Sequence, residues 1–224
     1  HCRGRIKAVS AERVRDEIEK ILSSEKPSIA FRTMEETELL PLILPELSRC
    51  SSVQQAGDPP FDLLTHLLQA CDFSPRQNLH VRMAALFHDI GKPVSMKVSE
   101  EGGITFHGHD KLSSKMTHAI LSRLRFPKAV EQHVCHLIEN HMIVYSETWS
   151  DGAVRRFIAR IGRPFLDDLF LLLEADCSGK QGSPFGSAFL QPFKRRIAQI
   201  NEQDSALSLR DLAVNGKTLK EKCG

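Results

Sequence analysis

Ionisable side chains lie on the apolar faces of several predicted helices, and this pattern limits the folds that the chain can adopt. A buried carboxylate or imidazole without a partner is costly in free energy, and a bound cation removes that cost. Helical bundles build metal sites by presenting such groups from several helices to one interior. At helical spacing, each of the following residues stacks over apolar residues of its own segment: His66, His88, Asp89, His141 and Asp176.

The adjacent pair His88-Asp89 has a simpler interpretation, namely a core histidine beside a capping aspartate. Taken alone, that interpretation would be preferred, but His66, His141 and Asp176 favour a metal site because each also faces the apolar side of its helix. Nine of the ten histidines lie between His66 and His141, a first sign of chemistry in this region. His109 follows a glycine at the start of a predicted helix, where its side chain can reach inward. We expect surface positions for His80, His118, His133 and His136, and we leave His107 open between the surface and the site.

Helical periodicity recurs along almost the whole chain, so the predicted fold class is all-α, a mainly helical bundle. The alternation across 94–98 and 104–106, around a turn at 100–103, predicts one small β-hairpin. A Gly/Ser/Pro-rich loop is expected at 177–186. We expect helices from Ser10 to Pro27 and at 34–47, 61–71, 80–88, 112–124, 128–140, 151–161, 165–175 and 193–200.

Composition excludes several classes of protein. The 224 residues carry a formal net charge of only +2, so any RNA-binding surface must be a local patch. None of the six cysteines has Cys-x-x-Cys spacing, which argues against a zinc ribbon and fits a reducing, cytoplasmic location. No apolar run reaches membrane-spanning length and no signal peptide is evident, so we expect no membrane partner. The chain does not begin with Met, and we expect it to be part of a longer protein.

The order of the inward-facing residues resembles the HD phosphohydrolase superfamily, which is named for its His…His-Asp…Asp pattern. The resemblance implies one or two divalent ions, and the imidazole-rich donor set suits Mn, Fe, Ni, Co or Zn better than Mg. Asp89 is the candidate bridge between two ions, and Lys92 is placed to meet a phosphate oxygen, although a solvated helix end explains Lys92 nearly as well. The expected ligands are His66, His88, Asp89, His109, His141 and Asp176.

The flanking segments resemble bacterial tRNA nucleotidyltransferases, the CCA-adding enzymes, and their poly(A) polymerase relatives. The resemblance implies that a catalytic head precedes residue 1 and that this chain alone does not add nucleotides. Asp110 replaces the glutamate of the family's Phe-x-Gly-His-Glu motif, and the motif near the C-terminus is imperfect. The similar segments are 4–13, 44–47, 106–110, 154–157 and 212–216.

Together these features predict a helical neck-like segment at 1–58, an HD phosphohydrolase domain at 59–180 and the start of a helical RNA-binding body at 181–224. The expected activity is metal-dependent hydrolysis of phosphate esters on nucleotides or RNA ends, with Asp89 and Lys92 as the catalytic residues. The resemblance implies 2′,3′-cyclic phosphodiesterase, 2′-nucleotidase and phosphatase activities.

Two alternatives stay open. The chain can serve chiefly as an RNA-holding body with a catalytically idle HD site, or as a hydrolase of guanosine tetraphosphate, which the flanking segments disfavour. The sequence does not determine the metal, the physiological substrate or the oligomeric state. Candidate contacts to tRNA phosphates, each of which can also be a simply solvated surface residue, are Arg155, Arg156, Arg160, Lys194, Arg195, Arg196 and Arg210.

Overall fold

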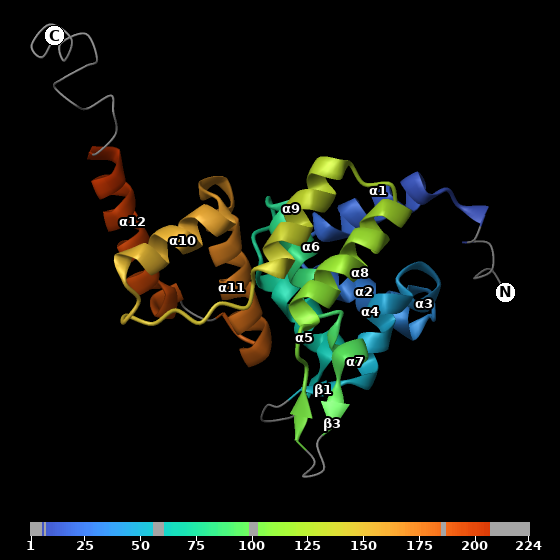
Figure 1. The fold of residues 1–224 in the computed structure, drawn as a ribbon. Coiled ribbons are helices and arrows are strands. Elements are labelled where there is room, and N and C mark those ends of the chain that lie inside the picture. Colours follow the sequence, from blue (N-terminus) through green and yellow to red (C-terminus); the bar gives the residue numbers. More distant parts are fainter. Residues whose placement is uncertain (1–5, 7, 56–60, 99–102, 185–186, 207–224) are drawn as a thin grey trace, which may run out of the picture. The chain divides into compact units, whose positions relative to one another are not determined.

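The computed structural model describes residues 6, 8–55, 61–98, 103–184 and 187–206, and most of them are helical (Figure 1). The all-α prediction is confirmed. Within the described residues, no helix has the length and apolar character needed to cross a bilayer. Arg210, the segment 212–216 and the predicted turn residues 100–102 lie outside the described part of the chain.

The chain divides into two compact units. The first comprises His1–Ile143 and Pro164–Gly186, and the second comprises Val144–Arg163 and Ser187–Gly224. Every residue predicted to bind metal belongs to the first unit, whereas the described candidates for RNA binding belong to the second. The three-segment division drawn from the sequence stays a prediction.

The first unit begins with α1 (Ala11–Leu22), where the hydroxyl of Ser10 accepts a hydrogen bond from the Arg13 amide as the N-cap. Pro27 then opens α2 (Pro27–Glu36), so the predicted helix start at residue 34 is wrong. Proline suits a first helical turn, whose amides have no intrahelical partner. Three short elements follow: α3 (Leu40–Ile43), α4 (Pro45–Ser48) and the 3₁₀ turn η2 (Arg49–Ser52).

Three helices pack against one another at the centre of the first unit, namely α5 (Leu63–Phe73), α6 (Leu79–Phe87) and α11 (Leu166–Gln181). The pair α8 (His109–Arg123) and α9 (Lys128–Glu139) covers α6. α5 and α6 begin at N-caps whose side chains accept hydrogen bonds from backbone amides. α5 buries four leucines in the core, and α6 buries a mixed apolar face that includes Val81, Met83 and Phe87. This packing places the ends of α6, α8 and α9 close to the middle of α5 and α11.

The predicted hairpin is confirmed as β3 (Lys97–Val98) paired antiparallel with β4 (Ile104–Thr105), and Figure 1 shows it projecting from the helices of its unit. Its first strand is shorter than predicted, because Val94 belongs to the short helix α7 (Lys92–Ser95). A second antiparallel pair, β1 (Gln54–Gln55) with β2 (Phe61–Asp62), was not predicted. Its polar sequence has no apolar alternation to signal a strand.

The predicted loop at 177–186 is wrong in its first half, because α11 continues to Gln181. Ser178 donates its hydroxyl to the Glu174 carbonyl, and Gly179 is a packing residue within the helix. The 3₁₀ turn η3 (Arg163–Phe165) immediately precedes α11, and its first residue, Arg163, is assigned to the second unit.

The second unit contains α10 (Asp151–Ile161), the 3₁₀ turn η4 (Ser187–Leu190) and α12 (Gln191–Ala206), and α10 packs on α12. Its core is aromatic: the Phe193 ring stacks on Tyr145 with centroids 4.2 Å apart and contacts Phe157 at 4.9 Å. α10 has the bounds predicted from the sequence.

Candidate metal centre

The structure brings together all six side chains that the sequence marked as metal ligands, and every one is buried. The five elements that supply them are α5, the turn after α6, the first residue of α8, the residue two past the end of α9, and α11. The donor atoms form two overlapping groups that share Asp89 and suit a metal ion. Their assignment as ligands stays a prediction, and the structure supplies its geometry: His66, His88, Asp89, His109, His141 and Asp176.

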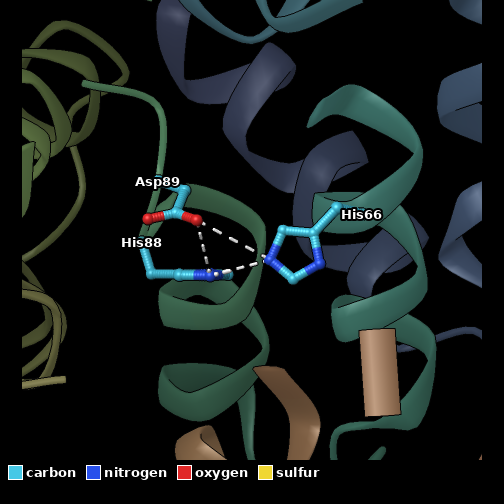
Figure 2. A group of neighbouring side chains, drawn as sticks. All are labelled: His66, His88 and Asp89. Carbon is cyan, nitrogen blue, oxygen red and sulfur yellow. Dashed lines mark hydrogen bonds and ion pairs between the residues drawn. The ribbon is translucent and has the colours of Figure 1, made fainter. Parts of the chain in front are cut away.

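One group surrounds the Nε2 atoms of His66 and His88, which lie 3.1 Å apart (Figure 2). Asp176 Oδ1 lies 3.1 Å from the His66 nitrogen and 3.2 Å from the His88 nitrogen. Asp89 Oδ2 completes the group at 3.4 Å from His88 and 3.7 Å from His66. Ligands held about 2.1 Å from one ion stand roughly 3 to 3.5 Å from one another, so these separations fit a single cation.

The other group lies around the second oxygen of Asp89. His109 Nε2 is 3.1 Å and His141 Nε2 is 3.6 Å from Asp89 Oδ1. Asp89 Oδ1 and His109 Nε2 are fully buried, and neither makes a hydrogen bond of good geometry within the described residues. Such atoms cost free energy unless something satisfies them, and a cation between them would do so. Asp89 therefore faces one group with each oxygen, as a bridging carboxylate would.

Three of the four histidines are oriented in the same way, each through its Nδ1 atom and the backbone carbonyl three residues earlier. A carbonyl only accepts, so Nδ1 must carry the proton. The Nε2 atom is then directed toward Asp89, as in histidine ligands whose other nitrogen is held by a hydrogen bond. His88 donates to Ala85 (2.9 Å), His109 to Phe106 (2.8 Å) and His141 to Ile138 (2.7 Å).

Charge is distributed unevenly over this centre. Burial lowers the pKa of His66. Burial also opposes protonation of His88, but the charge of Asp89 and the hydrogen bond to Asp176 outweigh it and raise the pKa of His88 to about 9. Burial opposes ionisation of Asp89 and Asp176, yet the surrounding histidines hold the pKa of both carboxyls well below its usual range. In the absence of a metal, the His66–His88 pair therefore holds an extra proton on His88.

Two lysines pair with the two carboxylates. Lys92 Nζ lies 2.6 Å from Asp89 Oδ2, and Lys180 Nζ lies 2.7 Å from Asp176 Oδ2. The Lys92 side chain is 11% exposed and also lies over the Phe106 ring, so it is not a solvated helix end. Lys180 was not predicted, although its position one helical turn after Asp176 was a signal for it. Burial lowers the pKa of Lys180, but Asp176 outweighs this and raises it.

An open pocket of about 350 Å³ leads to these groups. Both lysines line it, and residues 104–106 of the hairpin form part of its wall. The exposed ring of His107, whose place the sequence left open, also lines the pocket. The volume is in the range of small-molecule sites.

Two glycines allow the helices to approach closely enough to assemble the centre. A Cβ atom on Gly91 would lie 2.8 Å from the His109 carbonyl oxygen, and the Gly91 amide donates to Ser113 Oγ at 2.9 Å. A Cβ atom on Gly179 would lie 2.9 Å from the His66 carbonyl oxygen, where α11 crosses α5. Gly91 thus docks the turn of Asp89 on α8, and Gly179 brings Asp176 to His66.

The remaining histidines differ partly from expectation. His118 is exposed, as predicted. His80, His133 and His136 are half-buried rather than exposed, so their predicted surface placement holds only in part. The His80 ring stacks on His133, and the rings of His133 and His136 both contact Phe165 of η3. Such contacts between elements leave no signal in the apolar periodicity of a single helix.

The candidate RNA-binding residues lie on α10 and α12. Arg156, Arg160 and Arg195 are exposed, and Arg155 and Lys194 are half-buried. Arg196 pairs with Asp151 at the start of α10, so its charge is partly neutralised within the unit. Their contact with RNA stays a prediction.

Comparison with known proteins agrees with this centre. The HD domain family matches residues 63–176, which is about half of the chain and includes the first and last predicted ligands. The chain therefore belongs to the HD domain family. A second family, described as "Probable RNA and SrmB- binding site of polymerase A", matches residues 1–50.

Similar proteins include two tRNA nucleotidyltransferases, so the predicted resemblance is confirmed. The chain is 34% identical over 212 residues to an A-adding tRNA nucleotidyltransferase of Deinococcus radiodurans, covering 91% of this chain and 48% of that protein. It is 35% identical over 176 residues to a CC-adding tRNA nucleotidyltransferase of Thermus thermophilus, covering 76% and 40%. A multifunctional CCA protein of Hahella chejuensis is 30% identical over 216 residues, covering 90% and 50%. The chain thus spans about half the length of the curated relatives it matches.

Proposed function

We propose that this chain hydrolyses phosphate esters of nucleotides or RNA ends at the buried His/Asp centre, as a 2′,3′-cyclic phosphodiesterase, nucleotidase or phosphatase. The observation that carries the proposal is Asp89, whose two oxygens each face a group of imidazole nitrogens at the base of an open pocket. A purely structural role does not require buried carboxylates beside a solvent-accessible pocket. A bound divalent cation would lower the pKa of water and neutralise charge on a phosphate.

The residues of the chain supply the rest of the site. His66, His88 and Asp176 would hold one cation, and His109 and His141 would hold another across Asp89. Which ion binds is left to experiment, since imidazole-rich donors accept Mn, Fe, Ni, Co or Zn, and Mg less readily.

Lys92 and Lys180 supply positive charge at the pocket wall. Each ammonium group can pair with an anionic oxygen of a phosphate once a cation neutralises the carboxylate beside it. Both lysines would thus bind and orient the ester, and the Phe106 ring would help to hold the Lys92 ammonium group in place.

The decisive experiment is hydrolysis of 2′,3′-cyclic AMP by the purified chain, first stripped of metal and then supplied with Mn²⁺ or Ni²⁺. We expect turnover only with metal, and none in His88→Ala. His118→Ala is the matched control, because His118 is an exposed histidine on α8. Absence of turnover with every metal tested would refute the proposal.

We also propose tRNA as the macromolecular partner of the protein to which this chain belongs. The support is the set of tRNA nucleotidyltransferase relatives and the polymerase-type match at residues 1–50. The exposed side chains of Arg156 and Arg195 are the first candidates for phosphate contacts. Loss of tRNA binding in Arg156→Ala with Arg195→Ala, measured at two salt concentrations, would support this role, and unchanged binding would contradict it.

Because the chain spans about half the length of these relatives, we do not propose nucleotide addition to tRNA, which their names indicate, for this chain by itself. We propose a cytoplasmic location. Cys50, Cys71, Cys135 and Cys177 are free thiols in the structure, in keeping with a reducing compartment.

A further inference from the structure

We propose that His80, His133 and Asp168 form a second divalent-metal site, separate from the HD centre and suited to Zn²⁺ or a similar transition-metal ion. One donor atom from each residue lies within 4.8 Å of the others. The three residues come from three helices, α6, α9 and α11, all in the first unit. This site does not depend on the proposed hydrolase activity.

The donor set has the chemistry of a transition-metal site. Two imidazoles and one carboxylate bind Zn²⁺, Fe²⁺, Co²⁺ or Ni²⁺ and leave positions open for water. His133 Nε2 lies 2.7 Å from Asp168 Oδ2, and the His80 and His133 rings are parallel with centroids 4.2 Å apart. Ligands of one Zn²⁺ stand roughly 3.4 Å apart, so an ion would need only small side-chain rotations.

Asp168 is held in position by a second contact. The Asn78 side-chain amide donates to Asp168 Oδ1 at 2.6 Å, while its oxygen accepts the Val81 amide as the N-cap of α6. One carboxylate oxygen is therefore fixed and the other faces the histidines. Outer partners of this kind orient the carboxylate ligands of known metal sites.

His80 is the residue that a purely structural explanation does not account for. A His133–Asp168 ion pair would tie α9 to α11 without it. Within the described residues no hydrogen bond reaches the His80 ring, although the ring lies flat against His133. An imidazole with an unused nitrogen beside a histidine and a carboxylate can bind a metal ion.

The site is open to ions from solvent, since the side chains of His133 and Asp168 are 22% and 18% exposed. Its helices also carry ligands of the HD centre: α6 leads to His88-Asp89, α9 leads to His141, and α11 contains Asp176. An ion here would cross-link these three helices at one end and stiffen the scaffold of the HD centre.

The test is calorimetric titration of the metal-stripped chain with Zn²⁺. We expect His80→Ala and His133→Ala each to lose one Zn²⁺ equivalent relative to the unmodified chain, and Asn78→Ala to bind that equivalent about tenfold more weakly. His118→Ala, on an exposed histidine of the same unit, should bind as the unmodified chain does. His88→Ala should retain the Zn²⁺ equivalent bound by His80, His133 and Asp168. This result would show that the second site is independent of the HD centre.

Visible absorption of bound Co²⁺ provides a second test in case one of these variants fails to fold. Co²⁺ added to the His88→Ala chain should give the visible absorption of a site with nitrogen ligands, and further substitution of His80 should remove it. Equal Zn²⁺ stoichiometry and affinity in the unmodified chain and His80→Ala would overturn the proposal. If His133→Ala does not fold, His80→Ala is the variant that tests the proposal. Of these two histidines, His133 is the one that forms an ion pair with Asp168, so its removal is the more disruptive change. If Zn²⁺ binding by His80→Ala equals that of the unmodified chain, the cluster is only an ion-pair and stacking contact between helices.

Discussion

The Nε2 atoms of His66 and His88 lie 3.1 Å apart, and both rings are fully buried. Two unprotonated nitrogens at this distance would direct their lone pairs at each other, so one of the two carries a proton in the metal-free pair. The pKa is lowered for His66 and raised to about 9 for His88, so His88 is the residue that carries the extra proton. A metal ion bound between the two nitrogens must displace this proton.

The first prediction follows from that displacement. At pH 7 the metal-free His88 is charged, because its pKa of about 9 lies above the solution pH. Mn²⁺ or Zn²⁺ binding to the HD centre should then release about one proton, and affinity should rise as the pH is raised from 7 toward 9. Titration calorimetry in buffers of different ionisation enthalpy measures the number released. Binding with no proton exchange at pH 7 would contradict this account of the pair.

The second prediction concerns Gly91. An added methyl group would lie 2.8 Å from two backbone atoms, the His109 oxygen and the Ser113 nitrogen, and backbone cannot yield as a flexible side chain can. Gly91→Ala should lower the free energy of unfolding by about 2 kcal/mol. It should also weaken metal binding, since it separates Asp89 from α8. Urea denaturation and metal titration measure the two effects.

The matched control for this change is Gly152→Ala in α10. The nearest atom to its added Cβ is the end of the Arg156 side chain, at 3.5 Å. Alanine is the better helix former by up to about 1 kcal/mol, so this variant should be at least as stable as the unmodified chain. If both variants unfold at the same urea concentration, close packing at Gly91 is not what positions the turn.

The third prediction concerns Arg82, which is 2% exposed and has backbone carbonyls as hydrogen-bond acceptors. Its guanidinium donates to the carbonyls of Leu22, Ser24 and Ser74, and so joins the end of α1 to α6. Arg82→Met keeps the stem but leaves these carbonyls without donors, and the free energy of unfolding should fall by about 3 kcal/mol. Arg49→Met, at an exposed position, should change it by less than about 0.5 kcal/mol. Equal stabilities would show that water satisfies the carbonyls equally well.

The side chains gathered at the HD centre could mostly be predicted from the sequence, because five of the six share a helical face with apolar residues of their own segment, and His109 was proposed from its place after a glycine at a helix start. His66 beside Leu63 and Asp176 beside Leu172 carry that signal without any knowledge of tertiary contacts. The cluster of His80 and His133 carries no such signal, since its carboxylate is supplied by a helix more than thirty residues away in the chain, and the packing of α9 on α11 creates it.

Other differences from the prediction have equally local causes. Serine and glycine at 177–186 favoured a loop, but α11 continues through Gly179, where the close approach of α5 leaves no room for a side chain. That error also explains why Lys180 was not predicted. Lys180 reaches Asp176 only because the helix continues for one more turn beyond it. The strand pair β1–β2 is held by backbone hydrogen bonds, which leave no pattern in a polar sequence.

The last prediction tests Lys180 as a phosphate-binding residue. Its ammonium group pairs with Asp176 and lines the pocket, while half of its side chain is exposed, so substitution should not disturb the fold. Lys180→Met removes a charge that competes with metal, and metal affinity should stay the same or increase. The KM for 2′,3′-cyclic AMP should rise about tenfold, because one charge-assisted contact to the phosphate is lost. Lys115→Met, on the exposed surface of α8, should leave both quantities unchanged. Weaker metal binding with an unchanged KM would show instead that Lys180 serves only to position Asp176.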